Sequence, residues 1–156
     1  MYSNNLICDI LNYIDEHIND KISIDSLAST FYFNRFYIMK LFKRELNISI
    51  NEYINCIRIY NSTILIRNST YSMMMIGLSN GFFSLEYFSE VFKKIIGVSP
   101  LKYKKYCINR FVLDENDINT IINGSIYLES LVDLVNDYKK KKKPMVALVR
   151  KLSIFN

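Results

Sequence analysis

The chain has 156 residues, half of them hydrophobic, and its 20 basic and 15 acidic side chains give a formal net charge of +5. Such a chain can form a packed core in one large or two small domains, and its mild basicity permits a polyanionic partner without requiring one. The longest uncharged stretch, residues 68–85, is interrupted by Ser, Asn and Gly. The N-terminus also lacks the basic and apolar regions of a signal peptide, so we expect no membrane association and a cytoplasmic location.

The sequence does not indicate catalytic chemistry. Three widely separated cysteines and a single histidine, His17, fit no metal-binding spacing. A Gly-rich phosphate loop and a histidine-activated nucleophile are also missing. We expect buried, reduced thiols, with a redox sensor as the alternative, and we predict no enzyme activity, no cofactor and no metal site.

Apolar residues recur at three- and four-residue steps along most of the chain, which predicts an all-α protein. A first helix is expected over residues 3–19, and a short one from Ser23 or Asp25 to Thr30. The elements predicted after these are a helix over 34–46, a long connector helix over 49–67, a short helix over 72–80, a helix over 84–96 and a small helix over 100–106.

The segment 34–49 aligns without gaps on the segment 84–99, fifty positions further along. Asn34 and Ser84 begin the two copies, and both residue types cap helix N-termini well. Asn47 and Gly97 occupy the matching end positions, where a left-handed backbone is favoured. Each copy follows a short predicted helix, so each half of the region has a helix-turn-helix outline. A duplicated helix on a basic chain suggests a surface that meets a periodic partner.

The last fifty residues show a different pattern. Asp114 is predicted to cap a helix that Gly124 ends near residue 123, and Ser125 is predicted to cap another. The second helix carries apolar side chains that must be buried somewhere. We expect this segment to serve packing or self-association, with the basic run 139–143 as a solvated helix end. The pattern over residues 145–155 does not distinguish strand from helix.

Several residues resemble the DNA-binding domain of the AraC/XylS transcription regulators. The resemblance covers roughly residues 5–106 and is most specific between Gly81 and Pro100, including Phe92-Lys93-Lys94 and Gly97-Val98-Ser99-Pro100. It implies two helix-turn-helix subdomains joined by a long connector helix, with each subdomain placing one helix in a major-groove segment of double-stranded DNA. We therefore predict a double helix-turn-helix domain at 1–106 and a small, mainly helical C-terminal extension at 107–156.

The connector length agrees with that geometry. Nineteen helical residues span roughly 28 Å at about 1.5 Å per residue, and major-groove segments on one DNA face repeat about every 34 Å. Two departures from the family pattern stand out: Gly77 replaces a usual alanine, and Glu90 stands where a basic residue is common. Glu90 therefore makes any base preference of the family a poor guide for this chain.

Removing the buried stripe from each copy leaves the residues expected to face DNA. We expect two recognition helices, 34–46 and 84–96, to present side chains suited to contact base edges. In the first helix these are Arg35, Phe36, Met39 and Lys40, and in the second they are Leu85, Glu86, Ser89 and Glu90. Contacts to phosphates, which orient a protein without reading sequence, are expected from Asn34, Lys43, Arg44, Ser84, Lys93, Lys94, Lys102 and Lys104. The alternatives are a solvated helix face and cations placed favourably at helix C-termini.

The expected function is a bacterial, sequence-specific DNA-binding regulator of transcription. Two further partners are considered. One is RNA polymerase, and the other is a second copy of the chain, which would dimerise through the C-terminal extension. The alternative is a helical protein-interaction module that has lost DNA binding, which the acidic pair in the second recognition helix keeps open.

Overall fold

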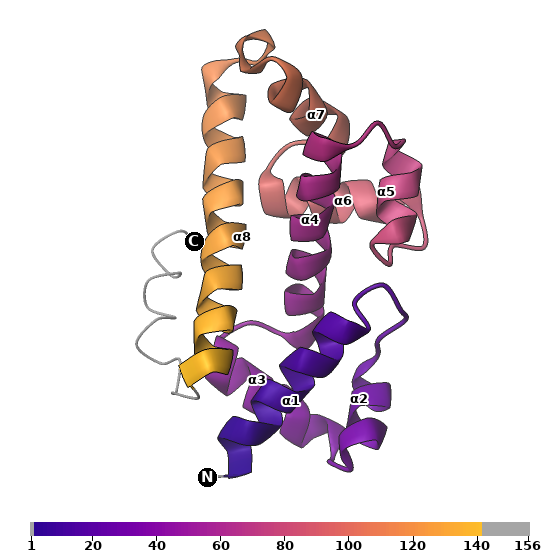
Figure 1. Cartoon of the computed structure of the whole chain (residues 1–156), viewed down its shortest axis with the longest axis vertical. Helices are drawn as coiled ribbons and strands as arrows, with labels where there is room; N and C mark the ends of the chain where they lie inside the picture. The colour runs from indigo at the N-terminus through magenta and orange to yellow at the C-terminus, as the bar shows by residue number, and fades with distance from the viewer. Residues whose placement is uncertain (1, 142–156) are drawn as a thin grey trace. The chain divides into compact units, whose positions relative to one another are not determined.

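The computed structural model describes residues 2–141, and these are helical throughout, without a strand. The elements, shown in Figure 1, are α1 (Tyr2–Glu16), α2 (Ile24–Phe31), α3 (Arg35–Leu46), α4 (Ile50–Asn68), α5 (Met73–Ser79), α6 (Leu85–Ile96), α7 (Pro100–Ile108), the 3₁₀ turn η1 (Arg110–Val112) and α8 (Glu115–Lys141). The all-α prediction is confirmed. The predicted connector corresponds to α4, a continuous helix of 19 residues.

The described residues form two compact units. One runs from residue 2 to Ile54 and resumes at Ser130, and the other is Asn55–Glu129. Each unit contains one copy of the duplicated helix, α3 in the first and α6 in the second. Both α4 and α8 begin in one unit and end in the other.

The core of the first unit is mainly aliphatic, with Phe42 and Tyr53 buried among the aliphatic side chains. Helix α1 presents one fully buried stripe, which contains Ile7, Ile10, Leu11 and Ile14, at the three- and four-residue spacing of an amphipathic helix. Helix α3 packs against both α1 and α2. The end of α8 adds Leu131, Leu134, Val135 and Tyr138, all buried, and Lys139 forms an ion pair with Asp15 of α1.

The core of the second unit contains a continuous run of aromatic rings. Ring centroids are separated by 5.2 Å between Phe82 and Phe88, 5.8 Å between Phe88 and Phe92, and 5.5 Å between Phe92 and Tyr103. These distances are in the favourable range for aromatic pairs. The run joins the start of α6, its centre and α7, and thereby fixes which face of α6 is turned outward.

The prediction that Gly124 ends a helix was wrong, because α8 continues through it without a break. A Cβ atom placed on Gly124 would lie 2.7 Å from Cα and 2.8 Å from the carbonyl oxygen of Ile96. Glycine is present here because the backbone of α8 approaches the end of α6 closely, and the hydrogen-bonded helix continues in spite of it. The predicted cap at the start of α8 is confirmed, since Asp114 Oδ1 accepts a hydrogen bond of 2.8 Å from the Asp117 N–H.

Two other expectations can be compared with the structure. Cys8 and Cys56 are buried, as predicted, whereas Cys107 is only half-buried, and these three cysteines form no disulfide within the described residues. None of the described helices is long and apolar enough to cross a bilayer. The predictions for the end of the basic run and for residues 145–155 lie outside the described residues.

Candidate nucleic-acid interface

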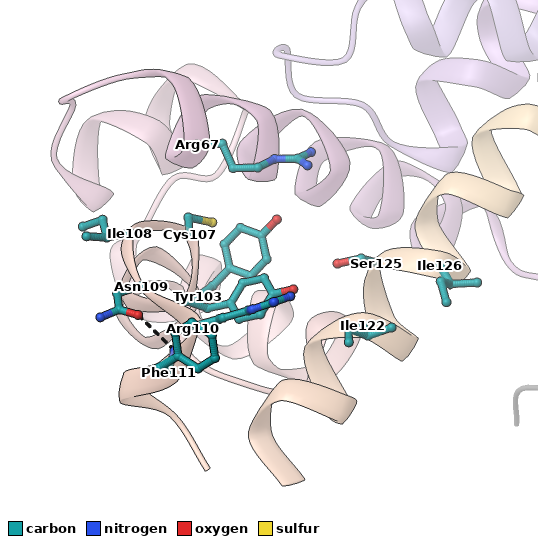
Figure 2. A pocket seen from close by; sticks show the side chains of 11 residues that line it. Arg67, Tyr103, Cys107, Ile108, Asn109, Arg110, Phe111, Ile122, Ser125 and Ile126 are labelled. Carbon is teal, nitrogen blue, oxygen red and sulfur yellow. Dashed lines mark hydrogen bonds between the residues drawn. The ribbon is translucent and has the colours of Figure 1, made fainter. Parts of the chain in front are cut away.

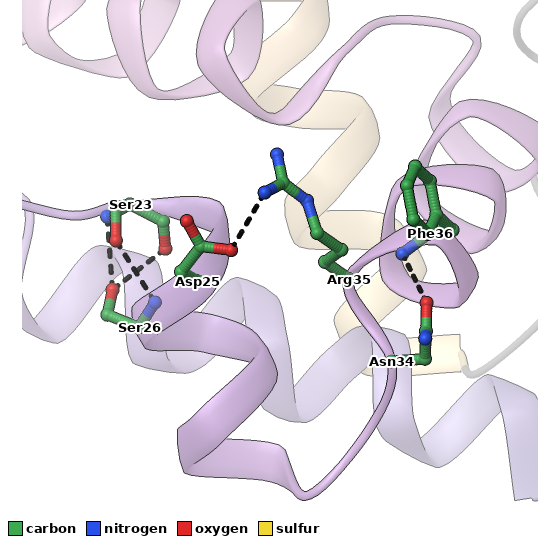
Figure 3. Close-up of polar contacts among 6 residues, drawn as sticks. All are labelled: Ser23, Asp25, Ser26, Asn34, Arg35 and Phe36. Carbon is green, nitrogen blue, oxygen red and sulfur yellow. Dashed lines mark hydrogen bonds and ion pairs between the residues drawn. The ribbon is translucent and has the colours of Figure 1, made fainter.

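Helix α3 begins and ends as the duplication predicts. Asn34 Oδ1 accepts a hydrogen bond of 2.8 Å from the Phe36 N–H (Figure 3), which satisfies one of the unpaired donors of the first turn. Asn47 ends the helix at φ 57°, and its N–H donates to the Lys43 carbonyl at 2.9 Å. Asparagine tolerates this left-handed backbone better than most residues.

Helix α6 repeats this geometry with different residues. The Ser84 hydroxyl accepts a hydrogen bond of 3.1 Å from the Tyr87 N–H. Gly97 ends the helix at φ 95°, and its N–H donates to the Lys93 carbonyl at 2.8 Å. The two copies therefore expose equivalent faces, and side chains at matching sequence positions can be compared directly.

The outward face of α3 is cationic and apolar. Phe36 is 65% and Met39 41% exposed, and Arg35 and Lys40 are exposed beside them. The Arg35 guanidinium lies 3.1 Å from an Asp25 carboxylate oxygen at the start of α2, as Figure 3 shows. Both partners of this ion pair are largely exposed, so it contributes little and can open at small cost when another anion approaches.

The outward face of α6 has a different character. Glu86 and Glu90 are exposed and Leu85 is 38% exposed. Ser89 is half-buried, whereas the other side chains predicted to read bases are exposed, so its hydroxyl is the least accessible of them. Carboxylates repel phosphates but accept hydrogen bonds from cytosine N4, so Glu86 and Glu90 are suited to select bases and do not add general affinity for DNA.

The residues predicted to contact phosphates differ in how freely they are presented. Lys93 and Lys94 are exposed at the end of α6. Lys43 Nζ donates to the Asn47 carbonyl at 2.8 Å, and Arg44 forms an ion pair of 2.8 Å with the buried carboxylate of Glu45.

Four further residues predicted to contact phosphates are partly buried or already form other polar contacts. Lys102 forms an ion pair with Asp117, and this hydrogen bond raises the pKa of its amine. Lys104 is half-buried. The side-chain oxygens of Asn34 and Ser84 accept the capping hydrogen bonds, which leaves an amide N–H₂ and a hydroxyl hydrogen to donate.

Sequence analysis missed a pair of exposed tyrosines. Tyr37 and Tyr87 are not among the residues predicted to face DNA, yet they are 42% and 48% exposed in the first turns of α3 and α6. The Tyr37 ring stacks on Phe33 at 5.3 Å, and the Tyr87 hydroxyl accepts a hydrogen bond of 3.2 Å from Asn55 Nδ2. Their identical place in the duplicated segment was the signal available in the sequence, because positions beside the N-cap lie off the buried stripe.

Two helix-turn-helix units with polar outward helices define a class of nucleic-acid-binding protein. The family model described as a helix-turn-helix domain matches residues 27–106, and the chain belongs to this family, in the AraC type of DNA-binding transcription regulators. Over the described residues, no group of acidic, histidine and cysteine side chains could hold a metal ion.

Individual relatives agree with this assignment. The chain is 33% identical over 95 residues to the regulatory protein PocR of Salmonella typhimurium, covering 61% of this chain and 31% of PocR. An AraC-type transcriptional regulator from Chromobacterium violaceum has a similar fold, with a TM-score of 0.57, 22% identity, and coverage of 64% of this chain and 88% of that one.

The DNA-binding domain of AdpA, whose structure was determined with a target DNA, also shares the fold. The TM-score is 0.60 at 19% identity, over 65% of this chain and 94% of that domain. The chain spans less than half the length of PocR and of the Escherichia coli regulators YkgA and the melibiose operon regulatory protein.

Proposed function

We propose that the chain recognises specific sequences in double-stranded DNA by placing α3 and α6 in successive major-groove segments. The observation that carries this proposal is the pair of helices with caps at matching positions, the same buried stripe and outward faces of different chemistry. Arg35, Phe36, Met39 and Lys40 would read one segment, and Leu85, Glu86, Ser89 and Glu90 the other. We further propose that the 19 residues of α4 set the separation between the two reading helices.

Selection from a random pool of duplexes tests the geometry of this proposal. The selected site should contain two blocks of defined base pairs, about one helical turn apart from centre to centre. Substitutions in α3 should change preferences in one block, and substitutions in α6 should change the other. Adjacent or overlapping blocks would contradict simultaneous engagement of both helices.

The alternative function is a protein-interaction module that has kept the fold and lost DNA binding. The zero net charge of α6 favours it, since Glu86 and Glu90 balance Lys93 and Lys94. Titration of duplex DNA at several salt concentrations separates the two functions. A regulator should bind with a steep negative dependence of log K on log salt, whereas failure to bind any duplex at low salt would favour the interaction module.

We propose that residues 1–106 read DNA and that the C-terminal extension stabilises them. In support, α8 supplies Leu128 and Ile121 to the core of the second unit and Leu134 and Tyr138 to the core of the first. A chain ending at Tyr106 should keep its base preference and lose stability, measured by urea unfolding together with duplex binding. Loss of preference at an unchanged folded fraction would make the extension part of the reading surface.

Two further partners belong to the same proposal, a second copy of the chain and RNA polymerase. Sedimentation of the chain with and without its selected duplex tests the first, since a dimer should appear at micromolar concentration. Transcription in vitro from a promoter that carries the selected site tests the second, because direct contact with the polymerase should change the transcript level from that promoter alone.

A further inference from the structure

A pocket of about 630 Å³ lies within the second unit, where α7, η1 and α8 meet the end of α4. Figure 2 shows Ile122 and Ser125 of α8 facing Tyr103 and Arg110 across this space, with Arg67 above them. The residues that matter for its chemistry are Arg67, Tyr103, Cys107, Arg110, Phe111 and Ile122. Its volume is in the range of pockets that bind small molecules.

Most of this pocket is built from chain outside the matched family domain, which ends at residue 106, since eight of its eleven lining residues follow that position. Asn109 shapes the new wall, because its Oδ1 accepts a hydrogen bond of 3.1 Å from the Phe111 N–H, drawn as a dashed line in Figure 2, and so begins η1. The lining includes none of the residues proposed to read bases or to contact phosphates. The pocket is therefore a site separate from the proposed DNA-binding surface.

The charged groups of this lining are two arginines. Arg67 Nε donates to the Thr63 carbonyl at 3.3 Å, which leaves its terminal nitrogens available, and the Arg110 guanidinium lies 5.2 Å above the Phe111 ring. Within residues 2–141, neither guanidinium forms an ion pair with a carboxylate. Glu129 lines a narrow adjoining pocket that also includes Arg67, and it does not form an ion pair with that arginine.

Burial also keeps a hydroxyl and a thiol of the pocket neutral at physiological pH. Burial raises the pKa of the Tyr103 hydroxyl to about 12, and burial also raises the pKa of the Cys107 thiol. Since this lining contains no carboxylate, the two arginines are its only charged groups. The electrostatic character of the pocket therefore favours an anion.

Several apolar side chains in the walls are open to solvent. Phe111 is 82% exposed, Ile108 77%, and Ile122 40%. Large apolar side chains grouped around a hollow indicate a ligand with an apolar body, because such surface is otherwise unfavourable in water. A nucleic-acid phosphate has no apolar body and would leave these side chains exposed.

We propose that this pocket binds a small organic carboxylate with an aromatic or aliphatic body. The carboxylate would lie between the guanidinium groups of Arg67 and Arg110, since guanidinium and carboxylate match in bidentate geometry. The body would cover Phe111 and Ile122. This proposed ligand site is independent of the proposed DNA-binding function, and each proposal can be tested without the other.

Isothermal titration of the whole chain with 1-naphthylacetate tests the proposal. The neutral amide 1-naphthylacetamide has nearly the same shape, and inorganic phosphate has charge without an apolar body. We expect saturable binding of the acid, with the amide and phosphate each weaker by roughly tenfold or more. The same loss is expected for the acid with the Arg67→Gln and Arg110→Gln variants, and Ser125→Trp should block binding by filling the pocket.

Lys21→Gln is the matched control, because it removes one positive charge from an exposed position in the first unit. It should bind the acid as the unchanged chain does. Circular dichroism establishes that each variant is folded, and Arg110→Gln, at an exposed position, carries the test if Arg67→Gln does not fold. Equal affinity for acid and amide, equal affinity for acid and phosphate, absence of binding, or unchanged binding in a folded Arg110→Gln variant would each overturn the proposal.

Discussion

Helices α3 and α6 have the same length and begin and end at matching positions, yet they carry different charge. Helix α3 has four basic side chains and one acidic one, whereas α6 has two of each. The acidic residue of α3, Glu45, is buried against Arg44, while both acidic residues of α6 are exposed. The two helices occupy matching positions in the duplicated segment, and their outward surfaces differ in the charge of their side chains.

The supports of the two helices differ as well. In the second unit, α8 approaches the end of α6 closely enough that its backbone at Gly124 contacts the backbone of Ile96. In the first unit, the contacts with α8 described above are made by side chains, including the ion pair between Lys139 and Asp15. Because backbones do not repack as side chains do, the position of α6 should be more sensitive to changes in α8.

Substitution of Gly124 by alanine should produce the largest effect, a loss of stability caused by the close approach of α8 to α6. The added Cβ would meet the Ile96 backbone at 2.7 Å, and we expect a net loss of about 2–3 kcal/mol in unfolding free energy, in spite of a helix-propensity gain of about 1 kcal/mol. Urea unfolding measures this change. Asn123→Ala, at the exposed neighbouring position, should change stability by about 0.5 kcal/mol or less. Equal effects of the two substitutions would contradict the close approach.

Matched pairs of basic residues test whether both units hold phosphates. Replacing Lys43 and Arg44 by alanine, or Lys93 and Lys94, should make the slope of log K against log salt shallower by about 1.8 in each case. At 0.15 M salt, that loss corresponds to roughly thirtyfold weaker binding, about 2 kcal/mol. Specific and random duplexes should be affected alike. A shift in base preference without a change in slope would contradict the phosphate role.

Substitutions on the outward faces should act with opposite sign on general affinity. Arg35→Ala should weaken binding to any duplex, whereas Glu86→Gln should strengthen it by removing a charge that repels phosphates. Each substitution should reduce the discrimination between bases at one position of the site by roughly 1–3 kcal/mol. Competition binding with single-base variants of the selected site measures both quantities.

Two controls accompany these variants. Asp25→Asn removes the ion pair of Arg35 without removing the guanidinium, and Glu115→Gln removes an exposed carboxylate outside the reading helices. Neither should relax any base pair. If Glu86→Gln lowered affinity for random duplexes, the carboxylate would not face DNA.

The smallest expected effect concerns how each short helix packs on its reading helix. A Cβ on Gly77 would lie 3.1 Å from the Phe88 ring, which is fully buried between Phe82 and Phe92. Gly77→Ala should therefore destabilise by about 1 kcal/mol, because overpacking outweighs the gain in helix propensity.

The first unit offers the comparison that makes this test specific. It has Ala28 and Ile38 at the corresponding positions. In a Phe88→Ile background, Gly77→Ala should be neutral or stabilising in urea unfolding, since the pair then matches that of the first unit. The same loss in both backgrounds would show that the Phe88 ring is not the obstacle.

The sequence by itself determined the features that depend on neighbours within a few positions. Asn34 and Ser84 cap helices, Asn47 and Gly97 end them with a left-handed backbone, and the apolar spacing selects the buried face. These properties are local because a side chain three residues away satisfies a backbone donor and a three- or four-residue period defines a helix face. The all-α class and the duplicated helix-turn-helix units follow from them.

The tertiary structure alone decided the features that join distant segments. The residues around Gly124 in the sequence predict a helix end at this glycine. In the structure, Gly124 instead permits the backbone of α8 to contact Ile96, 28 positions earlier. The pairing of Lys102 with Asp117 and the pocket between Arg67 and Arg110 arise in the same way. No local period encodes such contacts, because they depend on how closely two packed helices approach and on which side chains then share the space between them.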